Sequence, residues 1–276
     1  MQAAVQSQTW RRSILSEFRN LRLQDWKPAI ARHWTRDSDG YNRWVLHCLR
    51  SRTYRRPFEA IFSRVFGDEP LKLLDVGAGP GVLAFLLTGL GHRVTGIDLS
   101  PGMLKQAHQN AALLGLNVEF QPGDAEQLPF PDESFDGLAS RLVLWNLPNP
   151  ERALAEWARV LRPGGKLVII DVDMQSIRRE WWWRKPLRVA SAPLVMLTER
   201  RNPLKNQMSG QDIDKLPMSH VARPDWEIAE LAKLGFTGLR VERVNRASVG
   251  WMEFLKYGCW GDYIGLSGVK SGVSRS

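Results

Sequence analysis

The 276-residue sequence predicts an α/β protein with a mostly parallel sheet and helices on both of its faces. Two observations predict this class. Between residues 71 and 171, short apolar segments alternate with segments of helical period, and turn residues separate them. One of these turns, residues 77–81, contains three glycines in five positions. It lies between the first expected strand and the first expected helix.

The individual elements follow from the same patterns. Ser100 and Pro101 take the N-cap and first-turn positions of a helix, and Gly115 ends it. Pro224 and Asp225 begin a later helix that ends at Gly235. In total we expect helices at 81–90, 100–114, 150–161 and 225–235, and seven strands at 71–76, 93–97, 117–121, 134–140, 166–171, 239–244 and 263–269.

The domain organisation is predicted from the segments that flank this core. Residues 1–66 have a helical pattern and are expected to form an N-terminal cap, while residues 67–276 form the main domain. Within it, residues 172–223 lack a clear period and contain three consecutive tryptophans, so we expect a lid or substrate insertion. Cap and insertion are expected to cover the C-terminal edge of the sheet, where ligands bind in such folds.

Composition excludes several classes of protein. The chain is 43% hydrophobic and 24% charged, as in soluble globular proteins. No apolar run reaches the ~20 residues of a membrane-spanning helix, and the N-terminus lacks the apolar stretch of a secretory signal. Cys48 and Cys259 are the only cysteines, and the five histidines have no ligand spacing. We therefore expect a reducing, cytoplasmic location and no metal site.

The net charge of +9 is unevenly distributed. Residues 1–66 carry a net +8, residues 67–171 a net −5, and residues 172–276 a net +6. The basic excess therefore lies in the flanks. It is explained either by ordinary solvated helix faces or by attraction to an anionic substrate, a membrane surface or RNA.

The glycine turn carries the clearest chemical signal. Glycine at 77, 79 and 81 permits positive φ and a close approach of a ligand to the backbone, next to the free N–H groups of a helix N-terminus. Asp98 ends the second strand, where a carboxylate can accept hydrogen bonds from a ribose diol. A dinucleotide fingerprint would place its third glycine at Val82. The spacing therefore disfavours a nicotinamide enzyme.

Four ordered segments carry a resemblance to a known family. Residues 74–81 (LDVGAGPG) look like motif I of class I S-adenosylmethionine-dependent methyltransferases, and residues 96–100 (GIDLS) are similar to motif II. Residues 123–136 resemble the third motif and the start of the fourth strand, and residues 159–165 (RVLRPGG) match the segment before strand five. The branch nearest in pattern includes ubiquinone and menaquinone C-methyltransferases. The resemblance implies a Rossmann-like sheet and S-adenosyl-L-methionine as cofactor.

The same resemblance implies roles for individual residues. The three glycines would pass under the methionine portion of the cofactor, and Asp98 would hold its ribose. Asp124 would bond to the adenine amino group, although its side chain could instead cap a helix. Arg141 would lie near the methionyl end. The implied cofactor site comprises Asp75, Gly77, Ala78, Gly79, Gly81, Asp98, Leu99, Met103, Asp124, Ala125 and Arg141.

The acceptor side is less defined. Aromatic faces can stabilise a cationic sulfonium, and the candidates are Tyr41, Trp145, Trp181, Trp182 and Trp183, although so many tryptophans also fit a packing role. His220 is the one named candidate for a general base, and a solvated or core histidine is the alternative. A neutral amine or a thiolate acceptor needs no base.

Two motifs that are absent from the sequence restrict the class of methyl acceptor. No Asn/Asp-Pro-Pro-Tyr/Phe motif ends strand four, where residues 146–150 read NLPNP, and no cysteine follows that strand. Both absences favour methyl transfer to a small molecule, anionic or neutral, at nitrogen, oxygen, sulfur or carbon. Nucleic acid is disfavoured as a partner. An RNA methyltransferase and a catalytically silent cofactor-binding scaffold are the alternatives. The sequence leaves the oligomeric state open.

Overall fold

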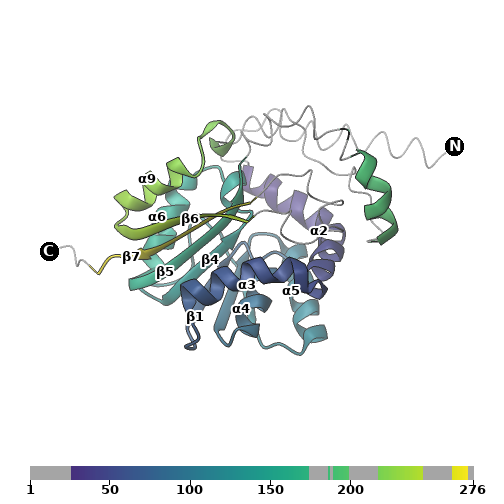
Figure 1. Ribbon diagram of the computed structural model, residues 1–276, viewed down its shortest axis with the longest axis horizontal. Helices are drawn as coiled ribbons and strands as arrows, with labels where there is room; N and C mark the ends of the chain where they lie inside the picture. The colour runs from purple at the N-terminus through teal and green to yellow at the C-terminus, as the bar shows by residue number, and fades with distance from the viewer. Residues whose placement is uncertain (1–25, 174–185, 187–188, 199–216, 245–262, 273–276) are drawn as a thin grey trace.

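A computed structural model describes residues 26–173, 186, 189–198, 217–244 and 263–272 (Figure 1). Its centre is a seven-stranded sheet in the order β3-β2-β1-β4-β5-β7-β6. Strands β1 to β5 run parallel, whereas β7 lies antiparallel between β5 and β6. The strands are β1 Lys72–Val76, β2 Arg93–Asp98, β3 Glu119–Pro122, β4 Phe135–Arg141, β5 Leu161–Val172, β6 Phe236–Val244 and β7 Tyr263–Lys270.

Helices cover both faces of the sheet and enclose two apolar cores. Neighbouring β1 residues point to opposite layers, so Leu73 joins one core and Leu74 the other. The first core is formed with α2 Trp26–Arg50, α3 Arg52–Phe66, α4 Val82–Gly89 and α5 Pro101–Leu114. The second is formed with η2 Leu144–Asn146, α6 Pro150–Val160 and α9 Asp225–Lys233. A short helical turn, η3 Pro217–His220, precedes α9.

The predicted fold class is confirmed, and the element boundaries agree to within a few residues at most ends. Ser100 caps α5 by accepting the Met103 N–H at 3.2 Å, and Gly115 ends it with a φ of 64°. The main difference is β5, which begins at Leu161 instead of residue 166. Leu161 already pairs with Phe135, so strand pairing starts before the Pro-Gly-Gly turn.

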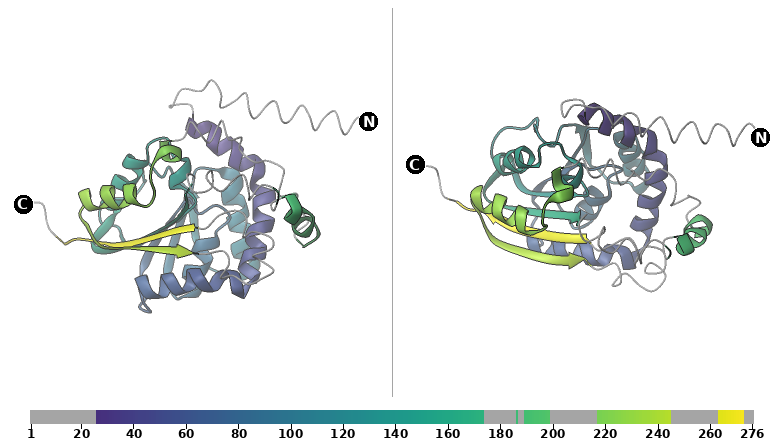
Figure 2. Two further views of the ribbon diagram at one scale, coloured as in Figure 1. Left: turned by 45° about the horizontal axis from the view of Figure 1, so that its top comes forward. Right: turned by 90° about the horizontal axis from the view of Figure 1, so that it is seen from above.

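Residues 189–198 form a helix that lies beside α2 and α3, on the side away from β6 and β7 (Figure 2). Its Val195 is fully buried in the same core as Trp44 and Val45. This helix and η3 are the described elements that lie within the predicted insertion, residues 172–223. Trp181, Trp182 and Trp183 lie outside the described residues.

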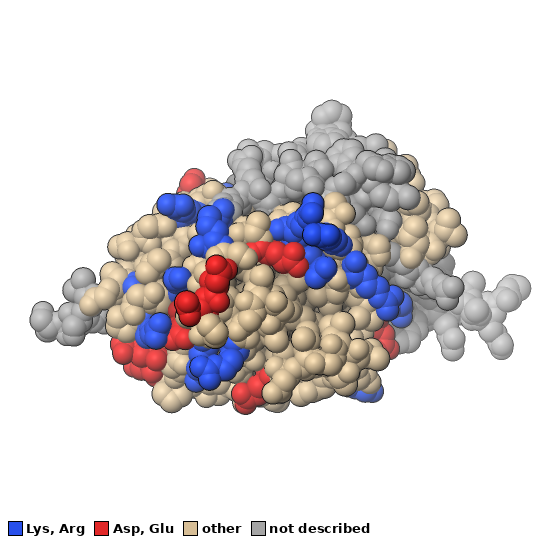
Figure 3. Space-filling model, turned by 60° about the horizontal axis from the view of Figure 1, so that its bottom comes forward, with Lys and Arg blue, Asp and Glu red and all other residues tan. Residues whose placement is uncertain are grey.

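The surface mixes charges of both signs. On the face drawn in Figure 3, basic and acidic side chains are interspersed over the described residues. Arg162 and Asp136, for example, form an ion pair of 2.8 Å. Among the helices that the structure describes, none is long and apolar enough to cross a membrane.

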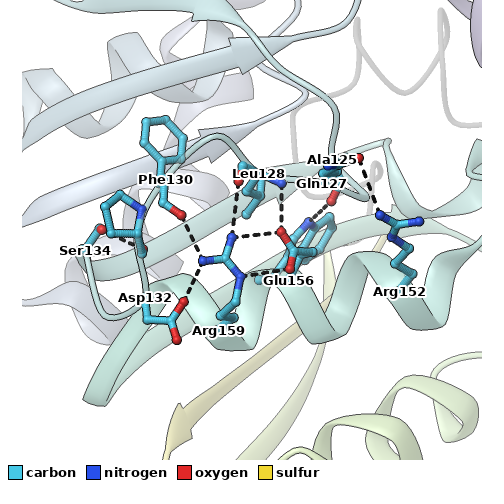
Figure 4. A network of polar contacts seen from close by, with 11 residues as sticks. Ala125, Gln127, Leu128, Phe130, Asp132, Ser134, Arg152, Glu156 and Arg159 are labelled. Carbon is cyan, nitrogen blue, oxygen red and sulfur yellow. Dashed lines mark hydrogen bonds and ion pairs between the residues drawn. The ribbon is translucent and has the colours of Figure 1, made fainter.

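A polar network fixes the segment that follows β3 (Figure 4). Arg159 of α6 donates to the Phe130 carbonyl at 2.8 Å and to the Leu128 carbonyl at 3.2 Å. It also pairs with Glu156 and Asp132, each at 2.8 Å. Glu156 in turn accepts the Leu128 N–H at 2.9 Å. One guanidinium therefore holds a loop that carries no regular secondary structure and begins just after Asp124.

We expect Arg159→Met to lower the free energy of unfolding by roughly 2 kcal/mol, because hydrogen bonds to charged groups contribute about 1.5–3 kcal/mol each and two carbonyls lose their donor. Urea denaturation measures the loss. Arg162→Met is the control, since its ion pair is solvent-exposed and contributes below about 1 kcal/mol. Equal losses in the two variants would contradict this account of the loop.

Candidate functional site

The turn between β1 and α4 is shaped by its glycines. Gly77, Gly79 and Gly81 have φ values of 70°, 54° and 94°, in the region that side chains disfavour. A Cβ on Gly77 would lie 2.1 Å from Val143 Cγ2, so no larger residue fits there. Among the described residues, a Cβ on Gly79 would meet the Tyr41 ring alone, at 3.9 Å. The backbone is therefore packed at Gly77 and open at Gly79.

Asp98 ties this turn to the end of β2. Its Oδ2 accepts the Gly79 N–H and its Oδ1 accepts the Ser100 N–H, both at 2.8 Å. Burial raises the pKa of Asp98 to about 6, although the backbone N–H donors oppose the rise. The backbone N–H groups of Ser100, Gly79 and Leu99 orient the carboxylate, and its remaining lone pairs can accept further hydrogen bonds. This geometry suits a carboxylate that receives hydroxyl groups from a ligand.

Asp75 lies beneath the turn rather than at its surface. It is 1% exposed, and its Oδ2 accepts the Ala84 N–H in the first turn of α4 at 3.0 Å. Burial raises the pKa of Asp75 to about 7, while the Ala84 N–H and the Arg141 charge lower it. Ala78 is also buried, and its N–H donates to the Ile97 carbonyl at 2.8 Å. Both residues join the turn to its neighbours.

The predicted adenine end lies beyond β2 and β3. Leu99 is 38% exposed, whereas Met103 is 2% exposed. Asp124 accepts the Glu126 N–H at 2.9 Å, so it caps its own turn, and it also pairs with Lys27 of α2 at 2.7 Å. The Ala125 carbonyl is held by the Trp157 indole N–H at 3.0 Å. No local sequence signal predicted the Lys27 pair, which joins residues 97 positions apart.

Arg141 ends β4 and points toward α2 and α3. Its guanidinium donates to the Tyr41 hydroxyl at 3.1 Å and to the Tyr54 hydroxyl at 3.3 Å, and it lies 5.1 Å from the centre of the Trp44 ring. The next residue, Leu142, has a φ of 60°, which is strained for a side chain of this size. The chain therefore turns sharply where β4 meets the site.

A buried ion cluster closes the end of β5. Arg223 lies 3.1 Å from Asp171 and 2.5 Å from Glu227, and its Nη1 donates to the Val172 carbonyl at 2.7 Å. Burial raises the pKa values of Asp171 and Glu227, and the Arg223 charge opposes both shifts. Asp171 also accepts the Trp145 N–H at 3.0 Å. This cluster positions Trp145, and no sequence pattern predicted that Arg223 would take part in the site.

The structure brings some acceptor-side candidates together and separates others. Tyr41 lies beside both Arg141 and Gly79. Trp145 is half-buried in η2, and its indole donates to the Leu142 carbonyl at 3.0 Å. His220 is exposed at the end of η3, which packs against η2. Its role as a base stays a prediction. The described residues contain no cluster of His, Cys, Asp and Glu that could hold a metal.

Known proteins share the central part of this site. Residues 74–169 match the family described as "Methyltransferase domain", a range that runs from β1 into β5 and contains the glycine turn, Asp98 and Arg141. In this range the chain is similar to methyltransferase domains. Their cofactor is the one that the sequence predicts, S-adenosylmethionine.

The relatives agree with the predicted resemblance. The chain is 41% identical over 104 residues to a demethylmenaquinone methyltransferase of Thermus thermophilus, covering 37% of this chain and 47% of that protein. It is 36% identical over 142 residues to a phosphatidylethanolamine N-methyltransferase of Cereibacter sphaeroides, covering 49% and 66%. The chain thus spans about half to two thirds of the length of these relatives. The resemblance to the ubiquinone and menaquinone branch is confirmed.

Solved structures agree on the fold. The crystal structure of the cyclase SpnF superposes with a TM-score of 0.54 at 23% identity, covering 79% of this chain and 81% of that one. This likeness concerns the fold alone, since a cyclase and methyltransferases share it. The chemistry therefore has to be argued from the residues of the site.

The raised pKa of Asp75 predicts a pH-dependent stability. The folded protein keeps a proton on Asp75 up to about pH 7, whereas the unfolded chain releases it near the ordinary value of 3.8. The stability that this proton contributes is present below pH ~4 and is lost as the pH rises to about 7. Asp75→Asn keeps an acceptor for Ala84 and removes the titration.

We therefore expect the free energy of unfolding of Asp75→Asn, relative to the unmodified protein, to increase between about pH 5 and pH 8. The increase is on the order of 2–4 kcal/mol, since one pKa unit corresponds to about 1.4 kcal/mol. Urea titrations at the two pH values measure it. A difference that is the same at both would mean that Asp75 titrates normally.

The packed position of Gly77 predicts a stability loss of a different kind. Gly77→Ala combines positive φ with a clash against Val143, so we expect the free energy of unfolding to fall by roughly 2–4 kcal/mol. Gly67→Ala is the control, because Gly67 has a φ of 79° and open space around it. Its expected loss is about 1 kcal/mol. Thermal unfolding compares the two, and equal losses would contradict the packing argument.

Proposed function

We propose that the protein transfers the methyl group of S-adenosylmethionine to a small-molecule acceptor. The observation that carries this proposal is the pairing of an open backbone at Gly79 with the oriented carboxylate of Asp98, inside a domain that matches methyltransferases. The residues present fit the cofactor. Gly79 has no side chain, so the space beside its backbone can hold a ligand. When bound, the cofactor supplies a sulfonium methyl that is already electrophilic.

The residues of this chain would bind and orient the two reactants. Asp98 would accept the ribose hydroxyls, and Leu99 and Met103 would flank the adenine. Asp124 is 26% exposed at its side chain and would approach the adenine amino group while Lys27 holds it. Positioning of this kind is the main contribution that an enzyme can make to a reaction between two small molecules.

The N-terminal helices would close the site. Lys27 and Thr35 of α2 bond to Asp124 and Ser100, the latter at 2.8 Å, so α2 lies against the loops that follow β2 and β3. We propose that residues 1–66 act as a cap and residues 172–223 as a lid over the acceptor. Tyr41 and Trp145 would then line the acceptor side, and His220 remains the candidate base. Water would be excluded from the reacting methyl group by this closure.

Among small molecules, a quinone precursor is the acceptor class that the relatives support. RNA is not favoured, because the face in Figure 3 has acidic groups beside its basic ones. A catalytically silent scaffold is not favoured either, because the glycine turn and Asp98 are intact. The two widely spaced cysteines support a reducing, cytoplasmic location.

Calorimetry with S-adenosylmethionine and S-adenosylhomocysteine tests the proposal. We expect the unmodified protein to bind both and Gly79→Arg to lose roughly 100-fold or more in affinity while its near-UV circular dichroism persists, because the new side chain fills the cofactor space. Gly91→Arg is the matched control, since Gly91 has a φ of 94° and open surroundings at the far end of α4. Absence of binding by the folded, unmodified protein would refute the proposal.

A further inference from the structure

Arg141 is a buried cation that bonds to no carboxylate among the described residues. It is 6% exposed, and its hydrogen-bond partners are the hydroxyls of Tyr41 and Tyr54. Its Nε–H has no acceptor among the described residues. Tyr263 and Cys48 are also close enough to influence it electrostatically. Asp75 acts on it electrostatically but bonds to Ala84 instead.

Arg223 shows what a buried arginine normally requires. It is 8% exposed, and it has two carboxylates and a carbonyl as partners. Buried charges in proteins are paired in this way because an unpaired one has a large desolvation cost. Arg141 is as buried as Arg223 and has no carboxylate partner within the described part of the chain. Its Nε–H and its charge are thus available for an anion.

Arg141 lies close to the glycine turn. Ser140 pairs with Val76, so Arg141 lies next to the first residues of the glycine turn. Tyr41, which accepts from Arg141, is also the side chain nearest to an added Cβ on Gly79, at 3.9 Å. Burial raises the pKa of Tyr41, so its hydroxyl stays protonated and can donate. The guanidinium and the phenol therefore offer several donors beside the open turn.

We propose that Arg141, Tyr41 and Tyr54 form a carboxylate-binding site that receives a carboxylate of one of the two reactants. The site rests on the proposed function, because a carboxylate is present on the aminoacyl end of the cofactor and is absent from the described groups that bond to Arg141. An acceptor carboxylate is the second source of the same chemistry. Arginine suits either, since its planar fork binds a carboxylate through two parallel hydrogen bonds.

The melting temperatures of two variants distinguish an arginine that binds a ligand from one that stabilises the fold. We expect Arg141→Met to leave the melting temperature unchanged or to raise it, because the variant removes a buried charge without leaving a carboxylate unpaired. Arg223→Met is the matched control and should lower the melting temperature strongly, since it leaves Asp171 and Glu227 unpaired. A loss in Arg141→Met as large as in the control would overturn the proposal.

Binding identifies the source of the carboxylate. If it belongs to the cofactor, Arg141→Met lowers the affinity for S-adenosylhomocysteine by roughly tenfold or more. The affinity for 5′-methylthioadenosine, which lacks the aminoacyl group, stays unchanged. If it belongs to the acceptor, both affinities stay unchanged. Arg141→Lys keeps the charge but loses the planar fork. If the cofactor is the source, the affinity of this variant for S-adenosylhomocysteine should lie between those of the unmodified protein and Arg141→Met.

Nitrogen-15 NMR of arginine-labelled protein observes the site directly. The Nε–H resonance of Arg141 is assigned by its absence from the Arg141→Met spectrum. We expect it to move downfield with S-adenosylhomocysteine if the cofactor is the source, or with acetate added to the 5′-methylthioadenosine complex if the acceptor is. Shifts with neither overturn the proposal. Should the unmodified protein bind no cofactor analogue, the proposed function fails, and acetate alone still decides whether Arg141 receives an anion.

Discussion

The turn between β1 and α4 has its shape because three of its residues carry no Cβ. Gly77 can lie against Val143 only as a glycine, and this contact brings the chain back across the end of β4. The next two N–H groups then reach β2, where they bond to the Ile97 carbonyl and to Asp98. Loop, strand end and carboxylate thus form one rigid unit, and the ligand approach at Gly79 depends on all three.

The two buried arginines show how the same residue type serves two purposes. Arg223 has its charge balanced by Asp171 and Glu227, so it joins β5 to α9 and orients the backbone of Trp145. Arg141 meets two phenols and an indole face at the end of the neighbouring strand. The first arrangement is complete within the protein, whereas the second leaves donors and charge for a bound anion.

Much of the fold could be predicted from the sequence because its signals are local. Strand periodicity, the Ser100 cap and the Gly115 stop each involve neighbouring residues, and they predicted the sheet and its helices. The side-chain pairs of the site are not local. Lys27 meets Asp124 across 97 positions, and Arg223 meets Asp171 across 52. Only the fold brings such partners together, so no spacing rule could have predicted them.

Donor chemistry and acceptor choice belong to different parts of the chain. The segment that matches methyltransferases, residues 74–169, contains the glycine turn, Asp98 and Arg141. Tyr41 and Lys27, which complete the two ends of the site, come from α2 and lie outside that segment. The similarity to methyltransferases over residues 74–169 therefore indicates which methyl donor is bound. Tyr41 lies outside that segment and faces the open turn at Gly79, so selection of the acceptor is assigned by our proposal to side chains such as this one.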